Sequence, residues 1–277
     1  IRVGRADVDL LSYEAVYELL AVHQPTHVIS AASKHGSFKE MQHAHRGFLR
    51  ENLIIDSNIL EASANCNIQN VYILSSISGL PESDQESDER MLSTGPVSHA
   101  NFGYNFSKYA STQLVKSYQL DGFRNFRSLL LGNIYGYNER FYRNTNVVAT
   151  LIKNMYKAKI SGANLELYGN GLDARCYTHL SDVRNILDFM TAQSHSDNEP
   201  IIISSSNSHT VKEIAYEIAN SMEYQKEILF EDKNSDTYTV KNVNNSKLIE
   251  TIGPYNFKSL ESGINDTVRE YLANTPT

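Results

Sequence analysis

What this sequence lacks excludes several classes of protein. It has only two cysteines, Cys66 and Cys176, and their spacing is typical of neither a zinc site nor a disulfide framework. So few cysteines are usual in a reducing compartment, and we predict a cytoplasmic protein. No apolar run is long enough to span a membrane, and the first residues do not read as a signal peptide, so no membrane partner is expected.

Positive charge is also scarce. The chain has 25 Lys and Arg against 32 Asp and Glu, a formal charge of −7, which argues against a nucleic-acid partner because like charges repel. There is no low-complexity tract and no internal repeat. At 277 residues the chain can bury a large core, as one two-lobed domain or as two small domains.

The first half of the chain alternates short apolar runs with longer amphipathic segments. The apolar runs, which predict buried strands, are 26–32, 70–76 and 126–135. The amphipathic segments, which predict helices, are 12–23, with Ser12 as its expected cap, 46–65 and 101–116. Residues 1–12 are expected to hold the end of a strand, and residues 33–44 a polar loop. This order predicts an α/β fold with a doubly wound, Rossmann-like parallel sheet. Ligands bind at the carboxyl ends of such strands, here 31–34, 75–76 and 131–133.

Beyond residue 140 the elements become shorter and less regular. We expect residues 1–140 to form the main domain, which a return of about 183–206 rejoins. Residues 141–182 and 207–277 are expected to form a smaller α/β lobe.

One pair of residues in the 101–116 helix has chemical potential. Tyr104 and Lys108 are four residues apart, so their side chains share a helix face. A lysine ammonium beside a tyrosine hydroxyl favours the phenolate, and such a tyrosine can exchange a proton with a sugar hydroxyl. The alternative is a chance pair on a solvated helix.

Blocks along nearly the whole chain resemble the extended short-chain dehydrogenase/reductases, the NAD-dependent epimerase/dehydratase family. Within it the GDP-L-fucose synthase branch is the most similar. The blocks are PTHVISAASKHG at 25–36, ENLIIDSNILEA at 51–62, YILSSIS at 72–78, YNFSK at 104–108, GNIYG at 132–136 and LYGNGLDARCYTHLSDV at 167–183. The resemblance implies an NADP-binding Rossmann-like domain, a substrate lobe, and a homodimer built from helices 46–65 and 107–120 as a four-helix bundle.

The resemblance also assigns site residues. The catalytic set would be Ser75, Tyr104 and Lys108, with Ser76 in place of Ser75 if the register is shifted by one. The residues assigned to the cofactor are Arg5, Ala31, Ala32, Lys34, Asn52, Tyr104, Lys108, Leu131 and Asn133. Those assigned to the nucleotide sugar are Ser75, Asn133, Lys153, Tyr168, Arg175 and Lys241. Arg5 favours NADPH over NADH, because a guanidinium suits the 2′-phosphate of the adenosine.

The sequence departs from the family in three places. The Gly-rich turn that binds the cofactor pyrophosphate does not precede the first helix, so we expect a fragment of a longer chain rather than a natural truncation. Ile77 stands where the family's epimerases have a cysteine, and Asn146 where they have a histidine. Neither side chain can serve as an acid or base at carbon.

The departures predict an NADPH-dependent nucleotide-sugar reductase that has lost the epimerase step. Its substrate would be a GDP-linked 4-keto-6-deoxy hexose or heptose, and its product would feed a surface polysaccharide. The alternatives are a full epimerase/reductase of the fucose-synthase kind and a non-catalytic homologue that binds a nucleotide sugar. No metal site is expected, because His23, His27, His43 and His45 fall on separate elements without matching acids.

Overall fold

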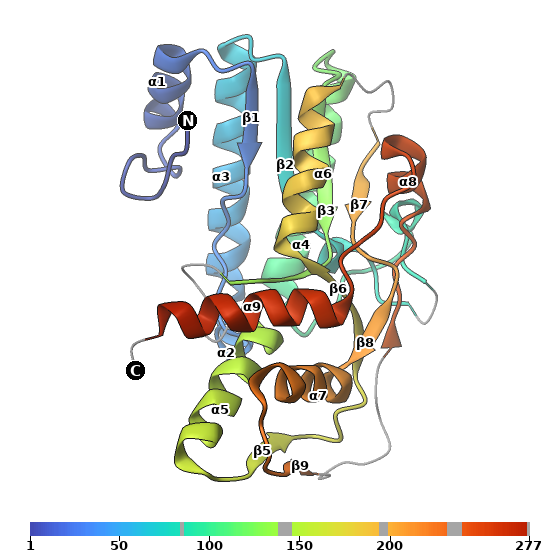
Figure 1. The fold of residues 1–277 in the computed structure, drawn as a ribbon. Helices are drawn as coiled ribbons and strands as arrows, with labels where there is room; N and C mark the ends of the chain where they lie inside the picture. Colours follow the sequence, from blue (N-terminus) through green and yellow to red (C-terminus); the bar gives the residue numbers. More distant parts are fainter. Residues whose placement is uncertain (84–85, 138–145, 194–198, 232–239, 276–277) are drawn as a thin grey trace. The chain divides into compact units, whose positions relative to one another are not determined.

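The three apolar runs of the first half and a strand at 201–203 form a four-stranded parallel sheet in the computed structural model (Figure 1). Its order is β1-β2-β3-β7, and its strands are β1 (His27–Ser30), β2 (Asn70–Ser76), β3 (Phe126–Leu131) and β7 (Ile201–Ile203). The structure describes residues 1–83, 86–137, 146–193, 199–231 and 240–275. This sheet belongs to unit 1, which comprises Ile1–Ser83, Ser87–Leu131 and Asp188–Ile203.

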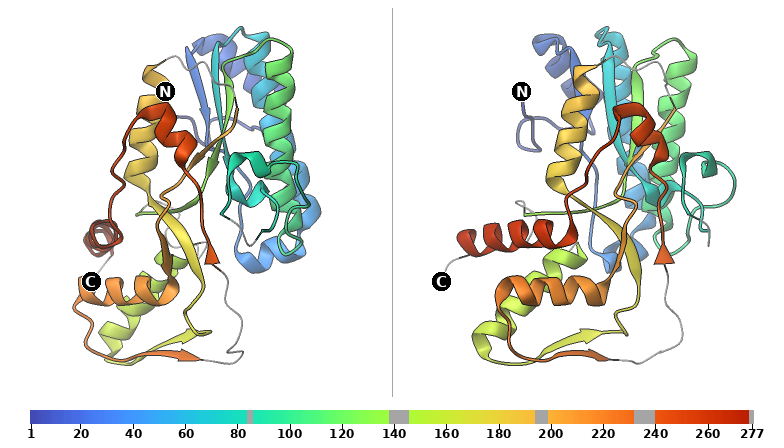
Figure 2. Two further views of the ribbon diagram at one scale, coloured as in Figure 1. Left: turned by 90° about the vertical axis from the view of Figure 1, so that its right-hand side faces the viewer. Right: turned by 45° about the vertical axis from the view of Figure 1, so that its right-hand side comes forward.

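Helices cover both faces of this sheet (Figure 2). One face is covered by α3 and α4, and the other by the part of α6 that belongs to unit 1. On that second face Tyr72 Oη in β2 donates to the Met190 carbonyl at 2.9 Å. The helices with residues in unit 1 are α1 (Tyr13–His23), α2 (Phe38–His43), α3 (His45–Asn65), α4 (Phe102–Leu120), α6 (Leu180–Ala192) and the 3₁₀ turns η1 (Ile77–Gly79) and η2 (Glu89–Met91).

The packing of α3 against α4 determines how the site is built. The contact begins at Gly103, where a residue with a Cβ would not fit. A Cβ at that position would lie 2.1 Å from the His45 carbonyl oxygen. Farther along the two helices, Asn52 Nδ2 donates to Ser107 Oγ at 3.2 Å, and Ser111 Oγ donates to Asp56 Oδ2 at 2.5 Å. Positions 52 and 56 of α3 therefore face positions 107 and 111 of α4, one turn apart on each helix.

Unit 2 comprises Asp84–Glu86, Gly132–Leu187 and Ser204–Thr277. Its strands form the sheet β10-β6-β4, with β8 antiparallel to β6, and a separate parallel pair, β5-β9. They are β4 (Asn133–Tyr135), β5 (Leu165–Tyr168), β6 (Ala174–His179), β8 (Ser208–Thr210), β9 (Ile228–Glu231) and β10 (Val240–Lys241). The helices are α5 (Val147–Ser161), α7 (Val211–Met222), α8 (Ser246–Ile252), α9 (Leu260–Asn274) and the first part of α6. The buried core of unit 2 includes Ile152, Met155, Ile214 and Ile264 from α5, α7 and α9.

The helix predicted at 12–23 is confirmed with its cap, since the Ser12 side chain accepts from the Ala15 amide. Three expectations are wrong. The expected strand end within residues 1–12 is a turn at 5–7, and the polar loop at 33–44 contains α2. The run 126–135 divides into β3 and β4, which belong to different sheets because β4 pairs with β6. The domain boundaries at 140, 182 and 206 stay predictions. Among the described residues, no helix is both long and apolar enough to cross a membrane.

Candidate functional site

Tyr104 and Lys108 lie in the first two turns of α4, as their spacing predicts. Tyr104 is partly buried, and Lys108 is 2% exposed. The Lys108 ammonium lies over the Tyr104 ring, 5.7 Å from its centroid, and donates to the Leu74 carbonyl of β2 at 3.4 Å. The structure therefore brings this pair against the end of β2.

The acidity of Tyr104 differs from the sequence-based expectation. Burial raises the pKa of Tyr104 to about 12, the negative charge of Asp56 adds to the rise, and a hydrogen bond with the Ser76 side chain offsets part of it. The expectation that Lys108 would hold Tyr104 as a phenolate is wrong for the protein alone, because its ammonium faces the ring and burial dominates. The phenol keeps its proton at neutral pH, as a proton donor must.

The two serines at the end of β2 have different surroundings. Ser75 is 3% exposed, and its Oγ donates to the Lys108 carbonyl at 3.0 Å and accepts from Thr112 Oγ1 at 3.4 Å. Ser76 is instead hydrogen-bonded to the Tyr104 side chain. Ser75 thus ties β2 to the backbone of α4, and the geometry favours Ser76, the second choice from the sequence, as the serine that faces the chemistry.

Ile77 directly follows the two serines, at the position where the resemblance places the family's cysteine. Next to it, Ser78 Oγ is buried and has no hydrogen-bond partner within the described part of the chain.

Asn146 is fully engaged as the N-cap of α5. Its Oδ1 accepts from the amides of Val148 at 2.8 Å and Ala149 at 3.4 Å, and its Nδ2 donates to the Ile134 carbonyl at 2.5 Å. An asparagine in this position satisfies helix amides that would otherwise lack partners. Its role in unit 2 is therefore structural.

The loop after β1 is held by Asn52. Asn52 Oδ1 accepts from the Lys34 amide at 2.6 Å and from Ser33 Oγ at 3.2 Å, while its Nδ2 donates to the Lys34 carbonyl at 3.2 Å. The Lys34 side chain forms an ion pair with Glu51. Ala31 is exposed and Ala32 is partly buried at the end of β1. Asn52 thus supports the strand end that the resemblance assigns to the cofactor.

The same loop brings His35 to Tyr104. The two rings meet edge to face, with centroids 5.3 Å apart and planes at 89°. The structure places the exposed imidazole against the ring of the candidate proton donor.

The other residues assigned to the cofactor in unit 1 are less enclosed. Arg5 is exposed in the turn closed by the Gly4 amide and the Asp7 carboxylate, which are 2.7 Å apart. Leu131 ends β3 and is partly buried. The backbone thus places Leu131, but not Arg5, at the end of a sheet strand.

Unit 2 carries five of the predicted residues. Arg175 of β6 and Lys241 of β10 occupy paired positions on neighbouring strands, which brings two cations together. Lys153 of α5 is buried, and burial lowers the pKa of its amine. Tyr168 is 80% exposed at the end of β5, and Asn133 Nδ2 donates to the Cys176 carbonyl at 3.2 Å.

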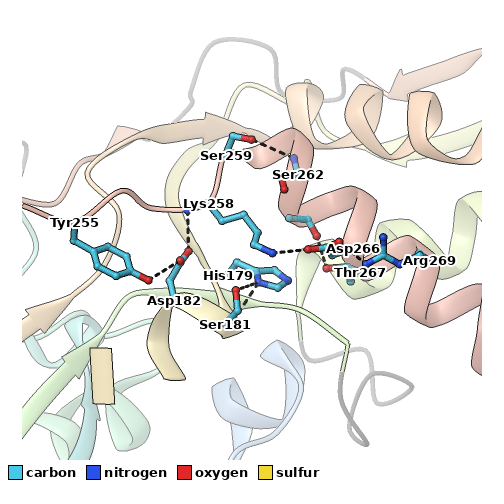
Figure 3. A network of polar contacts seen from close by, with 11 residues as sticks. His179, Ser181, Asp182, Tyr255, Lys258, Ser259, Ser262, Asp266, Thr267 and Arg269 are labelled. Atoms are coloured by element: carbon cyan, nitrogen blue, oxygen red, sulfur yellow. Dashed lines mark hydrogen bonds and ion pairs between the residues drawn. The ribbon is translucent and has the colours of Figure 1, made fainter. Parts of the chain in front are cut away.

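A second polar network lies in unit 2, and its hydrogen bonds and ion pairs join its own residues to one another (Figure 3). Asp182 accepts from Tyr255 Oη at 2.9 Å and from the Lys258 amide at 3.1 Å. The Lys258 amine pairs with Asp266, which also binds Arg269 at 2.6 Å. His179 bonds Ser181 Oγ at 2.7 Å, and burial lowers the pKa of its imidazole. The network fastens α9 and the segment before it to the start of α6.

Asp56 was not among the residues selected from the sequence. It lies one turn after Asn52 on α3, is 2% exposed, and bonds Ser111 of α4. An acid in the inward-facing row of an amphipathic helix was the available signal, since Ile59 and Leu60 on the same helix are buried.

Comparison with known proteins identifies the family and the fold of this chain. The model of the NAD dependent epimerase/dehydratase family matches residues 3–204. A GDP-L-fucose synthase of Sinorhizobium fredii is 28% identical, over 99% of this chain and 88% of that protein. A GDP-L-fucose synthetase of Naegleria fowleri bound to NADP shares the fold with a TM-score of 0.90 and 22% identity, over 98% of this chain and 84% of that one. A GDP-mannoheptose C4 reductase of Campylobacter jejuni with NADP bound shares the fold with a TM-score of 0.87 and 21% identity, over 98% of this chain and 89% of that one.

These similarities confirm the predicted α/β Rossmann-like fold and the relation to GDP-L-fucose synthases. The family model covers more than half of the chain, from the first strand of the sheet to the last. The protein belongs to the NAD dependent epimerase/dehydratase family.

Proposed function

We propose that the protein is an NADP-dependent oxidoreductase that reduces the C4 ketone of a nucleotide sugar. The substrate that fits best is a GDP-linked 4-keto-6-deoxy hexose or heptose. The observation that carries the proposal is the position of Tyr104 at the end of β2, where its side chain is hydrogen-bonded to Ser76 and the Lys108 ammonium lies over its ring. The related proteins named above are GDP-sugar enzymes, and two of the solved structures contain NADP.

The site has suitable groups for a nicotinamide cofactor. A lysine ammonium has three N–H donors, and the hydrogen bond of Lys108 to Leu74 is long at 3.4 Å, so donors remain for ribose hydroxyls. The exposed guanidinium of Arg5 suits a 2′-phosphate, which favours NADP(H) over NAD(H). Ala31, Ala32, Asn52, Leu131 and Asn133 complete the proposed cofactor set.

The reduction assigns each residue one task. The cofactor, when bound, supplies a hydride to C4 of the sugar. Ser76 donates a hydrogen bond to the C4 oxygen, and Tyr104 gives its proton to that oxygen as the negative charge develops. The positive charge of Lys108 stabilises the phenolate that remains. Lys153, Tyr168, Arg175 and Lys241 are proposed to bind the nucleotide diphosphate, for which the paired cations of β6 and β10 are suited.

We further propose that this reductase lacks the epimerase step. Ile77 stands where the family's epimerases have a cysteine, and an aliphatic side chain cannot serve as an acid or base. The Asn146 side chain caps α5 and bonds the Ile134 carbonyl. The main alternative, a full epimerase/reductase, is favoured by the GDP-L-fucose synthase relatives. A non-catalytic binding protein is the other alternative.

A single assay series separates these functions. NADPH oxidation is measured with a GDP-4-keto-6-deoxy sugar for the parent protein, for Tyr104→Phe and for the control Tyr109→Phe. Tyr109 is on the same helix, and its Oη bonds Ser93 Oγ at 3.0 Å. Loss of the proton donor should reduce turnover about 10²–10⁴-fold in Tyr104→Phe alone. If the parent protein binds NADPH and the sugar but shows no turnover, the non-catalytic binding protein is the correct alternative.

The same reaction run in D₂O tests the epimerase step. Deuterium at C3 or C5 of the product sugar would reveal proton exchange next to the ketone and would contradict its loss. Product without deuterium at those carbons supports a reductase.

We also propose a cytoplasmic homodimer that uses α3 and α4 in a four-helix bundle. The supporting feature is a row of rings formed by His99, just before α4, and by Phe102, Phe106 and Tyr109 of α4, whose neighbouring centroids are 5.7, 5.4 and 5.8 Å apart. His99 and Phe106 are exposed, Phe102 and Tyr109 are half-buried, and aromatic residues are enriched at protein interfaces. Light scattering that finds a monomer at micromolar concentration would refute the dimer.

A further inference from the structure

Two opposite charges are buried where α3 meets α4. Asp56 of α3 and Lys108 of α4 are each 2% exposed. The contacts between positions 52 and 107 and between 56 and 111 put Asp56 opposite the helix turn that carries Lys108. Of the acids that the structure describes in unit 1, Asp56 is the one buried to this extent.

Asp56 is held in place by a hydrogen bond across to α4. Its Oδ2 accepts from Ser111 Oγ at 2.5 Å, and Ser111 follows Lys108 by three residues, so both lie on one side of α4. From β2, the Leu74 carbonyl accepts from the Lys108 ammonium, and the Ser75 hydroxyl donates to the Lys108 backbone carbonyl.

Burial works against both charges, and each charge favours the other. Burial is the larger effect on each group: the pKa of Lys108 is lowered although the Asp56 charge raises it, and the pKa of Asp56 is raised although the Lys108 charge lowers it. Among the other titratable groups near this contact, Tyr104 belongs to α4, His35 meets Tyr104 from the loop after β1, and Lys34 is paired with Glu51. Without Asp56 the lysine would face burial with no opposing charge to offset it.

We propose that Asp56 is a positioning residue of the active site, the buried counter-ion that keeps the Lys108 side chain charged and aligned behind Tyr104. The inference rests on the proposed role of Lys108 in the reductase. It adds to the Ser76, Tyr104 and Lys108 set a residue that never touches substrate or cofactor. Its effect on the reaction passes through Lys108.

The proposal predicts a shift in the titration of one lysine. The protein with ¹³C-labelled lysine is titrated by NMR, and the Lys108 signal is assigned by its disappearance in Lys108→Met. In Asp56→Asn, which keeps the shape and can still bond Ser111, the midpoint of Lys108 should fall by about one pH unit, as expected for loss of a nearby opposite charge. The control is Ser63→Ala, because Ser63 is fully buried on the same helix and its Oγ has no hydrogen-bond partner among the described residues.

Asp56→Glu keeps the negative charge and should keep the Lys108 midpoint near that of the parent protein. It also serves as the test if Asp56→Asn does not fold. The proposal is overturned if Asp56→Asn folds and leaves the Lys108 midpoint in place, if Ser63→Ala moves it equally, or if Asp56→Glu displaces it by a full unit.

This readout needs neither substrate nor cofactor, so it separates the two proposals. If the parent protein reduces no keto sugar but the Lys108 midpoint shifts, the proposed reaction fails and the electrostatic pairing stands. If the parent protein is active, the basic limb of its turnover against pH should also move to lower pH in Asp56→Asn. An unmoved limb in that variant refutes the positioning role and leaves the reductase intact.

Discussion

Each of the two units has a charged network, and the networks differ in burial and in how fully their polar atoms are used. In unit 2, Asp182 accepts from Tyr255 and from the Lys258 amide, and Lys258, whose side chain is 26% exposed, pairs with Asp266. In unit 1, Lys108 is only 2% exposed, and its hydrogen bond to the Leu74 carbonyl is long at 3.4 Å. A satisfied network fixes a fold, whereas a buried cation with donors to spare is prepared for a ligand.

The largest effect on stability should come from breaking the unit 2 network. Asp182→Ala leaves the Tyr255 hydroxyl and the Lys258 amide without their acceptor, and each unsatisfied group costs about 1–3 kcal/mol. We expect a loss of about 3 kcal/mol in the free energy of unfolding, measured by urea denaturation. Glu250→Ala, at an exposed acid of α8, should change it by less than about 0.5 kcal/mol. Equal losses in the two variants would show that the network contributes nothing specific.

The two adjacent serines of β2 also differ in this way, since Ser75 bonds the Lys108 backbone and Ser76 bonds the Tyr104 side chain. Ser76→Ala should lower turnover of the keto sugar at least about tenfold, because a donor to the developing negative charge is lost. Ser75→Ala should lower the free energy of unfolding by about 1 kcal/mol, since it removes the bond to the Lys108 carbonyl, and should leave turnover nearly unchanged. Steady-state kinetics and urea denaturation of both variants decide the matter. The reverse pattern would restore Ser75 as the catalytic serine.

The smallest effect concerns pH. The hydrogen bond from Lys258 holds the pKa of Asp266 below its usual range. A carboxyl whose pKa is lower in the folded protein stabilises it above the ordinary pKa, and this contribution is lost as the pH falls through the lowered value. In Asp266→Asn the loss of stability between neutral pH and pH 3 should therefore be less steep, as thermal unfolding over this range would show. An unchanged slope would mean that this pair contributes no pH dependence. The unit 1 network, by contrast, should show its pH dependence on the basic side, through Lys108.

Much of unit 1 could be predicted because its signals are local. Helix α3 follows from the apolar spacing of 46–65, and the Tyr104–Lys108 pairing follows from the pitch of a helix. The break between β3 and β4 was missed because the apolar run continues through Leu131 into Ile134. Nothing in that run shows that the chain changes sheets, since strand pairing depends on residues far away in the sequence.

The site residues divide in the same way. The parallel α/β sheet, the helix that carries Tyr104 and Lys108, and the family could all be predicted from the amino-acid sequence. These features depend on periodicity and on ordered local motifs. Only the tertiary structure decided that Ser76 rather than Ser75 meets Tyr104, and that Asp56 lies opposite Lys108. Those choices depend on how β2, α3 and α4 pack. Adjacent residues of a strand point to opposite faces, and the local sequence pattern does not show which of two neighbouring serines faces α4.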